Sequence, residues 1–191
     1  FHGVSPFDPE TGEPRKAGGE NFSRVFGRTL LRLARNDGRI CALTAAMVGG
    51  TGLTAFAEAY PKRFFDVGIA EGCAASMAAG MAKQGAVPVF AVYSTFLQRS
   101  YDMLLHDMAI DGLHVVLAVD RAGLVGEDGE THHGVFDVAY LDSVPGITVY
   151  SPSNFAELDR MLEAAVCRCT GPAAVRYPRG GQGAFTADRS E

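Results

Sequence analysis

Six short runs of apolar residues, separated by stretches with helical spacing, constrain the fold of this chain most strongly. Runs such as Val-Pro-Val-Phe-Ala-Val-Tyr are apolar at nearly every position, which is typical of strands that are covered on both faces. Strand and helix in alternation predict an α/β fold: a doubly wound, mostly parallel six-stranded sheet with helices on both faces and right-handed crossovers. The expected strands lie at residues 40–44, 64–67, 87–93, 114–119, 147–150 and 173–177.

The first twenty residues differ in composition from the rest of the chain. They hold three prolines and four glycines, which favours an extended connector. From Asn21 on, apolar residues recur at three- and four-residue steps and predict a helix that ends near Asp37-Gly38. At 191 residues the chain has room for one domain. We therefore expect a linker over 1–20, a domain over 21–181 and the start of a second linker over 182–191.

Charge and hydropathy exclude several kinds of partner. A formal net charge of -5 leaves no basic surface for nucleic acid or for an anionic membrane. No apolar run reaches the roughly 18 to 20 residues that span a bilayer. The four cysteines show neither CxxC nor zinc spacing, so we expect reduced thiols and a cytoplasmic protein. The chain begins with Phe1 and shows no targeting signal, which we interpret as a start inside a longer gene.

Ligands of such sheets bind outside the carboxyl ends of the strands, so residues that follow each strand are the first candidates for a site. Glu71 follows the second strand and begins a helix of small side chains over 74–80. A carboxylate there gains roughly 0.3 to 1 kcal/mol from the helix dipole, which alone accounts for it. A functional carboxylate is the alternative.

Aromatic and basic residues follow the third, fourth and sixth strands. Phe96 comes after the third strand and fits either the core or a binding surface. The glycine-rich loop 120–134 contains His132-His133, which fit solvated side chains, proton transfer or a grip on phosphate. Neighbouring histidines rarely bind one metal ion, so we expect no metal site there. After the sixth strand, Arg176 and Arg179 fit either phosphate binding or an exposed linker.

Three segments carry a resemblance to a known family: Phe64–Glu71, Tyr93–Arg99 and Asp120–Gly126. Together with most of the remaining chain, they resemble the transketolase-like family of thiamine-diphosphate enzymes, and within it the 1-deoxy-D-xylulose-5-phosphate synthases. The resemblance implies the central, pyrimidine-binding domain of a transferase in isoprenoid biosynthesis. Such an enzyme condenses pyruvate with glyceraldehyde 3-phosphate and releases carbon dioxide.

The resemblance also implies roles for individual residues. Glu71 matches the glutamate that hydrogen-bonds the aminopyrimidine ring and favours the imino tautomer that removes the proton from thiazolium C2. Phe96 matches the aromatic residue stacked on that ring, and His132 is expected to shuttle protons or steady the intermediate. Five further residues match the substrate side of the pocket: Tyr93, Arg99, Arg121, Asp128 and Arg179.

The diphosphate half of the site is not visible in this sequence. In the family, thiamine diphosphate and magnesium are held by a Gly-Asp-Gly segment and a later Asn; Asn36-Asp37-Gly38 is the one local likeness, with no matching Asn downstream. The resemblance places that half in a preceding domain and adds a third domain after this one. We expect the isolated chain to be inactive, to need that missing domain or subunit, and to form a homodimer through the small-residue face at 74–80.

Two pairs of neighbouring residues depart from the family pattern. Val48-Gly49 stands where Pro-Glu is usual, and Gly72-Cys73 where Gln-His is usual. These losses of polar side chains leave a non-catalytic or divergent paralogue open beside the synthase. A transketolase-like enzyme with another acceptor is a further alternative, because the same cofactor residues fit it.

Overall fold

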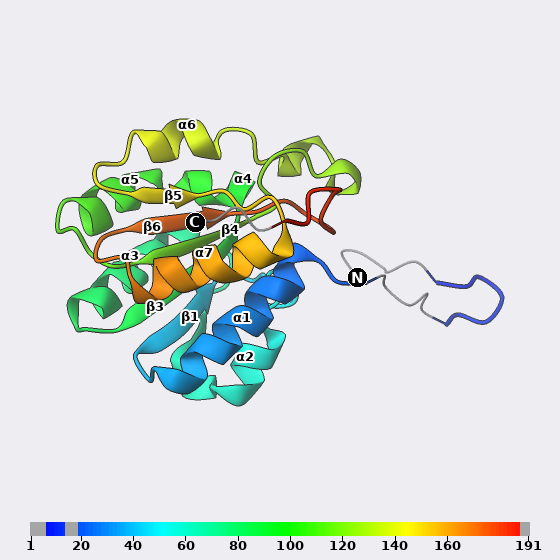
Figure 1. Ribbon diagram of the computed structural model, residues 1–191, viewed down its shortest axis with the longest axis horizontal. Coiled ribbons are helices and arrows are strands. Elements are labelled where there is room, and N and C mark those ends of the chain that lie inside the picture. Colours follow the sequence, from blue (N-terminus) through cyan, green and yellow to red (C-terminus); the bar gives the residue numbers. More distant parts are fainter. Residues whose placement is uncertain (1–6, 14–18, 188–191) are drawn as a thin grey trace.

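The computed structural model describes residues 7–13 and 19–187, and its centre is a sheet of six parallel strands (Figure 1). The strand order is β2-β1-β3-β4-β6-β5. The predicted fold class is confirmed, and each predicted strand ends within two residues of its expected place. The strands are β1 (Ile40–Thr44), β2 (Phe64–Asp66), β3 (Val87–Tyr93), β4 (Val116–Asp120), β5 (Thr148–Tyr150) and β6 (Ala173–Arg176).

Helices cover both faces of the sheet (Figure 1). One face carries α1 (Phe22–Asn36), α2 (Thr54–Ala59) and α7 (Phe155–Cys167). The other carries α3 (Glu71–Lys83), α4 (Ser94–Leu97), α5 (Tyr101–Met103) and α6 (Asp137–Asp142). The remaining helical segments are the 3-10 helices η1 (Pro61–Arg63), η2 (Gln98–Ser100), η4 (Gly126–Asp128) and η5 (Glu130–His132), and the π-helical segment η3 (Leu104–Ala109).

The strands divide the core into two layers because successive side chains point to opposite faces. Ala42 and Val89 pack toward α1 and α7, whereas Leu43 and Phe90 pack toward α3. Each of the four is fully buried. The near-continuous apolar strand sequences therefore have the cause that was expected, namely cover on both faces.

Helix α1 packs against the loop that follows β1 and is hydrogen-bonded to the segment that follows β6. Asn21 caps the helix by accepting a hydrogen bond from the Arg24 amide, and the amide of Phe22 donates to the carbonyl of Gly180 beyond β6. A Cβ on Gly27 would collide with the carbonyl of Gly52, so glycine is needed where helix and loop touch. Segments from three parts of the chain thus meet at one end of the sheet.

The small-residue face of α3 corrects one expectation. Ala74, Ala75, Ala78 and Ala79 are buried against the chain's own sheet instead of being left for a partner. A local run of small residues predicts that a helix packs closely, but it does not reveal against what. The expected dimer therefore loses this surface as its basis.

The predicted linkers fall partly outside the described residues, which omit 1–6, 14–18 and 188–191. Within the first linker, residues 7–13 form a turn in which the Asp8 amide donates to the carbonyl of Glu13. At the other end, the side-chain amide of Asn154 donates to the carbonyl of Ala187.

Candidate functional site

The candidate site lies at the carboxyl edge of the sheet, where the chain changes direction across it. From β1 the chain moves to β2 on one side and then to β3 on the other. Loops that leave β1 and β3 therefore run to opposite faces and open a crevice between them. All eight residues that the sequence marked for a site lie at this edge, in the segments that end or follow β2, β3, β4 and β6.

The first group of residues is built around Glu71, which begins α3 and is 4% exposed. Its Oε1 accepts a hydrogen bond from Nη1 of Arg99 at 2.7 Å. The guanidinium of Arg99 also lies over the ring of Phe96, 5.1 Å from its centroid. Glu71 and Phe96 are thus bridged by one planar, cationic N–H donor.

Aromatic rings extend this group along the edge. Phe96 stacks on Tyr93 with ring centroids 5.9 Å apart, and the ring of His132 meets Phe96 edge-on at 5.4 Å. A hydrogen bond from the hydroxyl of Thr95 to the carbonyl of Thr131 joins the two segments. Burial, as the main cause, raises the pKa of the Tyr93 phenol, so this hydroxyl stays protonated at neutral pH.

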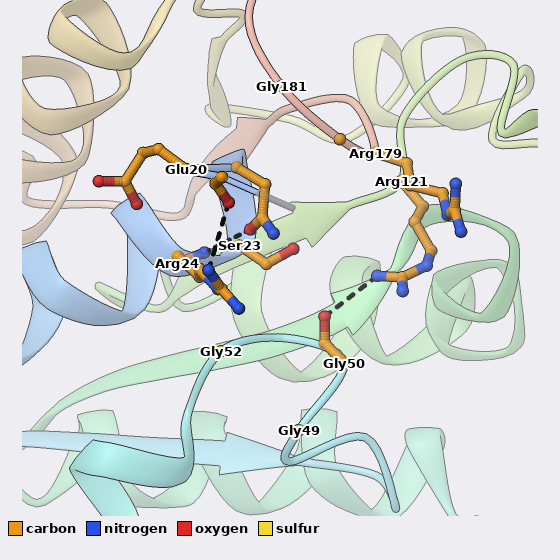
Figure 2. A pocket seen from close by; sticks show the side chains of 12 residues that line it. Glu20, Ser23, Arg24, Gly49, Gly50, Gly52, Arg121, Arg179 and Gly181 are labelled. Carbon is orange, nitrogen blue, oxygen red and sulfur yellow. Dashed lines mark hydrogen bonds between the residues drawn. The ribbon is translucent and has the colours of Figure 1, made fainter. Parts of the chain in front are cut away.

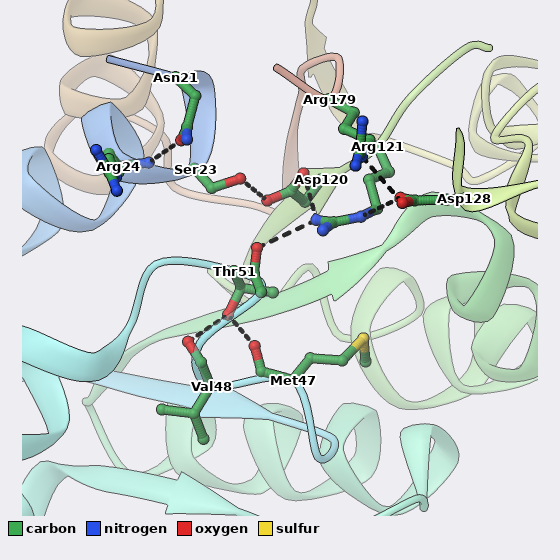
Figure 3. A network of polar contacts seen from close by, with 11 residues as sticks. Asn21, Ser23, Arg24, Met47, Val48, Thr51, Asp120, Arg121, Asp128 and Arg179 are labelled. Atoms are coloured by element: carbon green, nitrogen blue, oxygen red, sulfur yellow. Dashed lines mark hydrogen bonds and ion pairs between the residues drawn. The ribbon is translucent and has the colours of Figure 1, made fainter. Parts of the chain in front are cut away.

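The second group centres on Arg121, directly after β4 (Figure 3). Its guanidinium lies 3.7 Å from the centroid of the Tyr93 ring, a cation–π contact that joins the two groups. Its Nε donates to Oδ2 of Asp128 at 3.0 Å, and Nη1 donates to the carbonyl of Gly50 at 3.1 Å. Arg121 is thereby tied to loops after two different strands.

Asp128 holds two arginines at once. Its second oxygen, Oδ1, lies 3.0 Å from Nε of Arg179, which comes from the segment after β6. Nη2 of Arg179 also lies 3.7 Å from the exposed Glu127. Two guanidinium groups from distant parts of the chain are therefore set side by side, an arrangement suited to a phosphate group.

A pocket of about 560 Å³ adjoins this second group (Figure 2). Its walls come from the start of α1 and from the loops that follow β1, β4 and β6. The lining residues are Gly19, Glu20, Asn21, Ser23, Arg24, Gly49, Gly50, Gly52, Arg121, Arg179, Gly180 and Gly181.

Sequence reasoning missed two polar residues beside the pocket. The side chain of Asp120, at the end of β4, has no exposed surface, and its Oδ2 accepts a hydrogen bond from Ser23 at 2.6 Å. Burial raises the pKa of Asp120 to about 6, against the opposing effects of the Arg121 charge and the Ser23 hydrogen bond. An acidic residue at the end of an otherwise apolar strand was the available signal, since a buried charge needs partners.

Gly50 is a further residue that the sequence analysis did not single out. A Cβ at this position would collide with the hydroxyl of Tyr93. The glycine therefore lets the loop after β1 approach the aromatic part of the site closely.

The positions that depart from the family pattern lie near the site. Gly49 lines the pocket, and a Cβ there would meet nothing within 4 Å. A Cβ on Gly72 would lie 3.0 Å from Cε of Met103, which is the end of a flexible side chain, and Cys73 is exposed. A larger side chain would therefore fit at Gly49, and at Gly72 only when the side chain of Met103 shifts.

Three other residues that the sequence analysis considered for a site make hydrogen bonds or ion pairs with other parts of the chain. His133 accepts a hydrogen bond from the Val125 amide through Nδ1, which braces the loop after β4. Arg176 binds the buried Asp137 at 2.8 Å. Asp37 lies before β1, at the opposite edge of the sheet, and pairs with Arg39 at 2.7 Å.

Residues 7–13 and 19–187 contain no group of three or more His, Cys, Asp or Glu side chains placed to hold a metal ion. Within the same residues, no helix has the length and apolar character of a membrane span. The four cysteines, which all lie in the described residues, are free thiols.

Among solved structures, the fold is similar to two transketolases. A split-gene transketolase, described as an inactive β4 tetramer, superimposes with a TM-score of 0.76 at 27% identity, over 90% of this chain and 56% of that one. Transketolase from Leishmania mexicana gives a TM-score of 0.75 at 18% identity, over 91% of this chain and 28% of that one. The second likeness shows the fold alone.

Sequence relatives point to one group of enzymes. The 1-deoxy-D-xylulose-5-phosphate synthase of Syntrophus aciditrophicus is 54% identical over 98% of this chain and 29% of its own length. The synthase of Symbiobacterium thermophilum is 57% identical over 94% of this chain and 27% of its own length. The chain thus spans less than a third of these relatives. The family model described as "Transketolase, pyrimidine binding domain" matches residues 20–182, so the chain belongs to the transketolase pyrimidine-binding domain family.

Proposed function

We propose that this chain is the pyrimidine-binding domain of a 1-deoxy-D-xylulose-5-phosphate synthase that uses thiamine diphosphate to join pyruvate and glyceraldehyde 3-phosphate with loss of carbon dioxide. The observation that carries the proposal is that Glu71 and Phe96, at the carboxyl edge of the sheet, both contact one planar N–H donor, the guanidinium of Arg99. The identity to synthases supports it, at 54% and 57% for the two described above.

The residues present fit the pyrimidine ring of the cofactor. Glu71 and Phe96 already bind a planar N–H donor, the guanidinium of Arg99, through a hydrogen bond and a ring face. An aminopyrimidine offers the same combination of planar ring and N–H groups. When bound, the cofactor supplies the nucleophilic carbon and the electron sink for the reaction. Glu71 then accepts a hydrogen bond from the ring, and Phe96 fixes the ring plane.

The remaining residues form the substrate side in this proposal. Arg121 and Arg179 bind the phosphate of the aldehyde, because Asp128 presents both guanidinium groups side by side. His132 stands beside the aromatic pair, where it moves protons or steadies the reacting group. Tyr93 connects both sides through its contacts with Phe96 and Arg121.

The ligands of the diphosphate and of magnesium lie outside this chain in the proposal, in a further domain or subunit. Support comes from the small share of its relatives that the chain spans, and from the related chain described as an inactive β4 tetramer of a split-gene transketolase. Exposed apolar side chains of Leu124, Val135 and Phe136 flank the backbone bridge between Gly123 and Gly134 and offer a surface for that part. A homodimer, through a surface other than the buried alanine face of α3, is also part of the proposal. A cytoplasmic location, which free thiols favour, completes it.

A divergent, non-catalytic domain is less well supported. Loss of function would remove the constraint on side chains that contact one another only to bind a ligand. Here a continuous line of contacts runs from Glu71 through Arg99, Phe96 and Tyr93 to Arg121 and Asp128. A different acceptor fits the same cofactor residues, and the experiment below separates it from the synthase.

The test uses the assembled enzyme, which we define as this chain together with the remaining parts of the synthase, in one polypeptide or as separate subunits. Pyruvate and glyceraldehyde 3-phosphate should yield 1-deoxyxylulose 5-phosphate and carbon dioxide, and Glu71→Gln should abolish turnover. Glu58→Gln, at an exposed site on α2, is the matched control and should keep full activity. Turnover with sugar phosphates but not with this pair would favour another transketolase-like enzyme. No turnover with any pair would favour the non-catalytic alternative.

A further inference from the structure

Arg121 is held unusually firmly for a residue that lines a pocket. Its backbone is left-handed, with φ of 60°, a conformation that side-chain-bearing residues rarely adopt. The next residues keep it there, because the Ala122 amide donates to the carbonyl of Tyr177 at 3.0 Å and the Gly123 amide donates to Gly134 at 2.7 Å. The start of the side chain is therefore fixed before its guanidinium makes any contact.

Three acceptors then fix the plane of the guanidinium. Asp128 binds Nε on one side, while the carbonyl of Gly50 and Oδ1 of Asp120 bind Nη1 at 3.1 and 3.2 Å. Among the described residues, Nη2 makes no hydrogen bond, and the residue lines the pocket. These contacts leave one edge of the guanidinium for a ligand (Figures 2 and 3).

Asp120 is the unexpected member of this set. Its carboxylate is completely buried, beside the core residue Tyr177, whose own hydroxyl finds no hydrogen-bond partner among the described residues. Burying a charge is costly unless it is paired and hydrogen-bonded. Asp120 has two side-chain partners: Arg121, and the hydroxyl of Ser23 in the first turn of α1. A strand-terminal apolar residue would fill this space without that cost.

We propose that Asp120 is a positioning residue: clamped by Ser23, it holds the guanidinium of Arg121 at the pocket wall with one edge turned to the anionic group of the substrate. The inference rests on the proposed function, in which Arg121 meets the phosphate of the aldehyde. The hydroxyl of Ser23 connects the Asp120–Arg121 pair to α1. The helix, the end of β4 and the pocket wall therefore form one rigid unit.

A purely structural role for Asp120 would be to pin α1 to the sheet. The chain offers a matched control, because Asp137 is equally buried and binds Arg176 at 2.8 Å but lines no part of the pocket. Asp137→Asn should lower stability and leave the KM for glyceraldehyde 3-phosphate unchanged. Asp120→Asn, by contrast, should raise this KM.

The kinetic test is a double-mutant cycle in the assembled enzyme. Asp120→Asn should raise the KM for glyceraldehyde 3-phosphate about tenfold, as the loss of one charge-assisted hydrogen bond implies, with kcat changed less than about threefold. Ser23→Ala should raise KM in the same direction but less. In an Arg121→Ala background, Asp120→Asn should add nothing further, because it acts through Arg121. An unchanged KM, or a full additional effect in that background, would overturn the proposal.

A second test does not depend on activity. In the 191-residue chain itself, NMR can follow exchange of the Arg121 Nε proton with solvent. Exchange should quicken about tenfold in Asp120→Asn and several-fold in Ser23→Ala, and stay as in the wild type in Asp137→Asn. If Asp120→Asn does not fold, Ser23→Ala decides. Equal exchange in all variants would refute positioning by Asp120, whereas failure of the assembled wild type to turn over would refute the proposed function alone.

Discussion

Nη1 of Arg99 lies 2.7 Å from Oε1 of Glu71, so the carboxylate at the start of α3 is covered by a guanidinium from η2. The two partners differ greatly in exposure, since 57% of the Arg99 side chain is accessible against 5% for Glu71. A ligand that hydrogen-bonds to Oε1 of Glu71 therefore displaces Arg99, and the exposed Arg99 can move into solvent.

Arg99→Ala should consequently strengthen cofactor binding by the assembled enzyme. Removal of the competing guanidinium should lower the Kd for thiamine diphosphate several-fold, while loss of a substrate-side cation should raise the KM for glyceraldehyde 3-phosphate. Titration calorimetry measures the first effect and steady-state kinetics the second. Arg39→Ala removes an arginine with a carboxylate partner at the opposite edge of the sheet and should change neither. A Kd equal to the wild-type value would show that Arg99 does not compete for Glu71.

The isolated chain should bind thiamine diphosphate only at millimolar concentration or more weakly. Most of the cofactor's charge is on its diphosphate, and this chain offers mainly ring stacking and one carboxylate, worth roughly 2 to 4 kcal/mol before the entropy of association is subtracted. Titration calorimetry of the 191-residue chain with the cofactor and magnesium checks this. Micromolar affinity would mean that the chain holds more of the cofactor than we propose.

Gly50→Ala should destabilise the chain, because its Cβ would collide with the hydroxyl of Tyr93. A cost of about 1 to 3 kcal/mol corresponds to a Tm lowered by roughly 3 to 10 °C for a chain of this size. Removing the hydroxyl with Tyr93→Phe should restore part of the loss. Gly49→Ala, which meets open space, serves as the control and should melt like the wild type. Equal melting of both alanine variants would contradict the close approach.

The raised pKa of Asp120 makes a definite prediction for stability against pH. Burial raises it from 3.8 to about 6 in the folded protein, so the folded state binds this proton more tightly than the unfolded state does. The contribution of this group to stability is therefore present at acidic pH and disappears as pH rises through about 6. The free energy of unfolding can be measured in urea for the wild type and for Asp120→Asn. The difference between the two should favour the wild type by about 2 kcal/mol more at pH 4.5 than at pH 7. A difference that does not vary with pH would place the pKa of Asp120 near its ordinary value.

The strands could be predicted from the sequence because burial on both faces leaves a direct mark, an unbroken apolar run, as in β3 and β4. The edge that carries the site followed from the parallel topology. Glu71 and Phe96 were singled out because each follows a strand, and Arg121 was singled out through the family resemblance; the structure places all three at this edge, and their roles stay predictions.

Other features depend on tertiary contacts that local sequence does not encode. The alanines of α3 show that a helix packs closely without showing that its own sheet is the partner. The clamp of Ser23 on Asp120 joins residues 97 positions apart, and the approach of Gly50 to Tyr93 joins two loops. Such pairs become visible only when the sheet order is known.

Proton exchange at thiazolium C2 in the assembled enzyme tests the central claim most directly, because it reports the step assigned to Glu71 without requiring turnover. NMR of the bound cofactor should show that exchange slows sharply in Glu71→Gln, since glutamine keeps the shape of the side chain but lacks the carboxylate. Glu58→Gln should exchange at the wild-type rate. An unchanged exchange rate in Glu71→Gln would contradict the assignment of this chain as the pyrimidine half of the site.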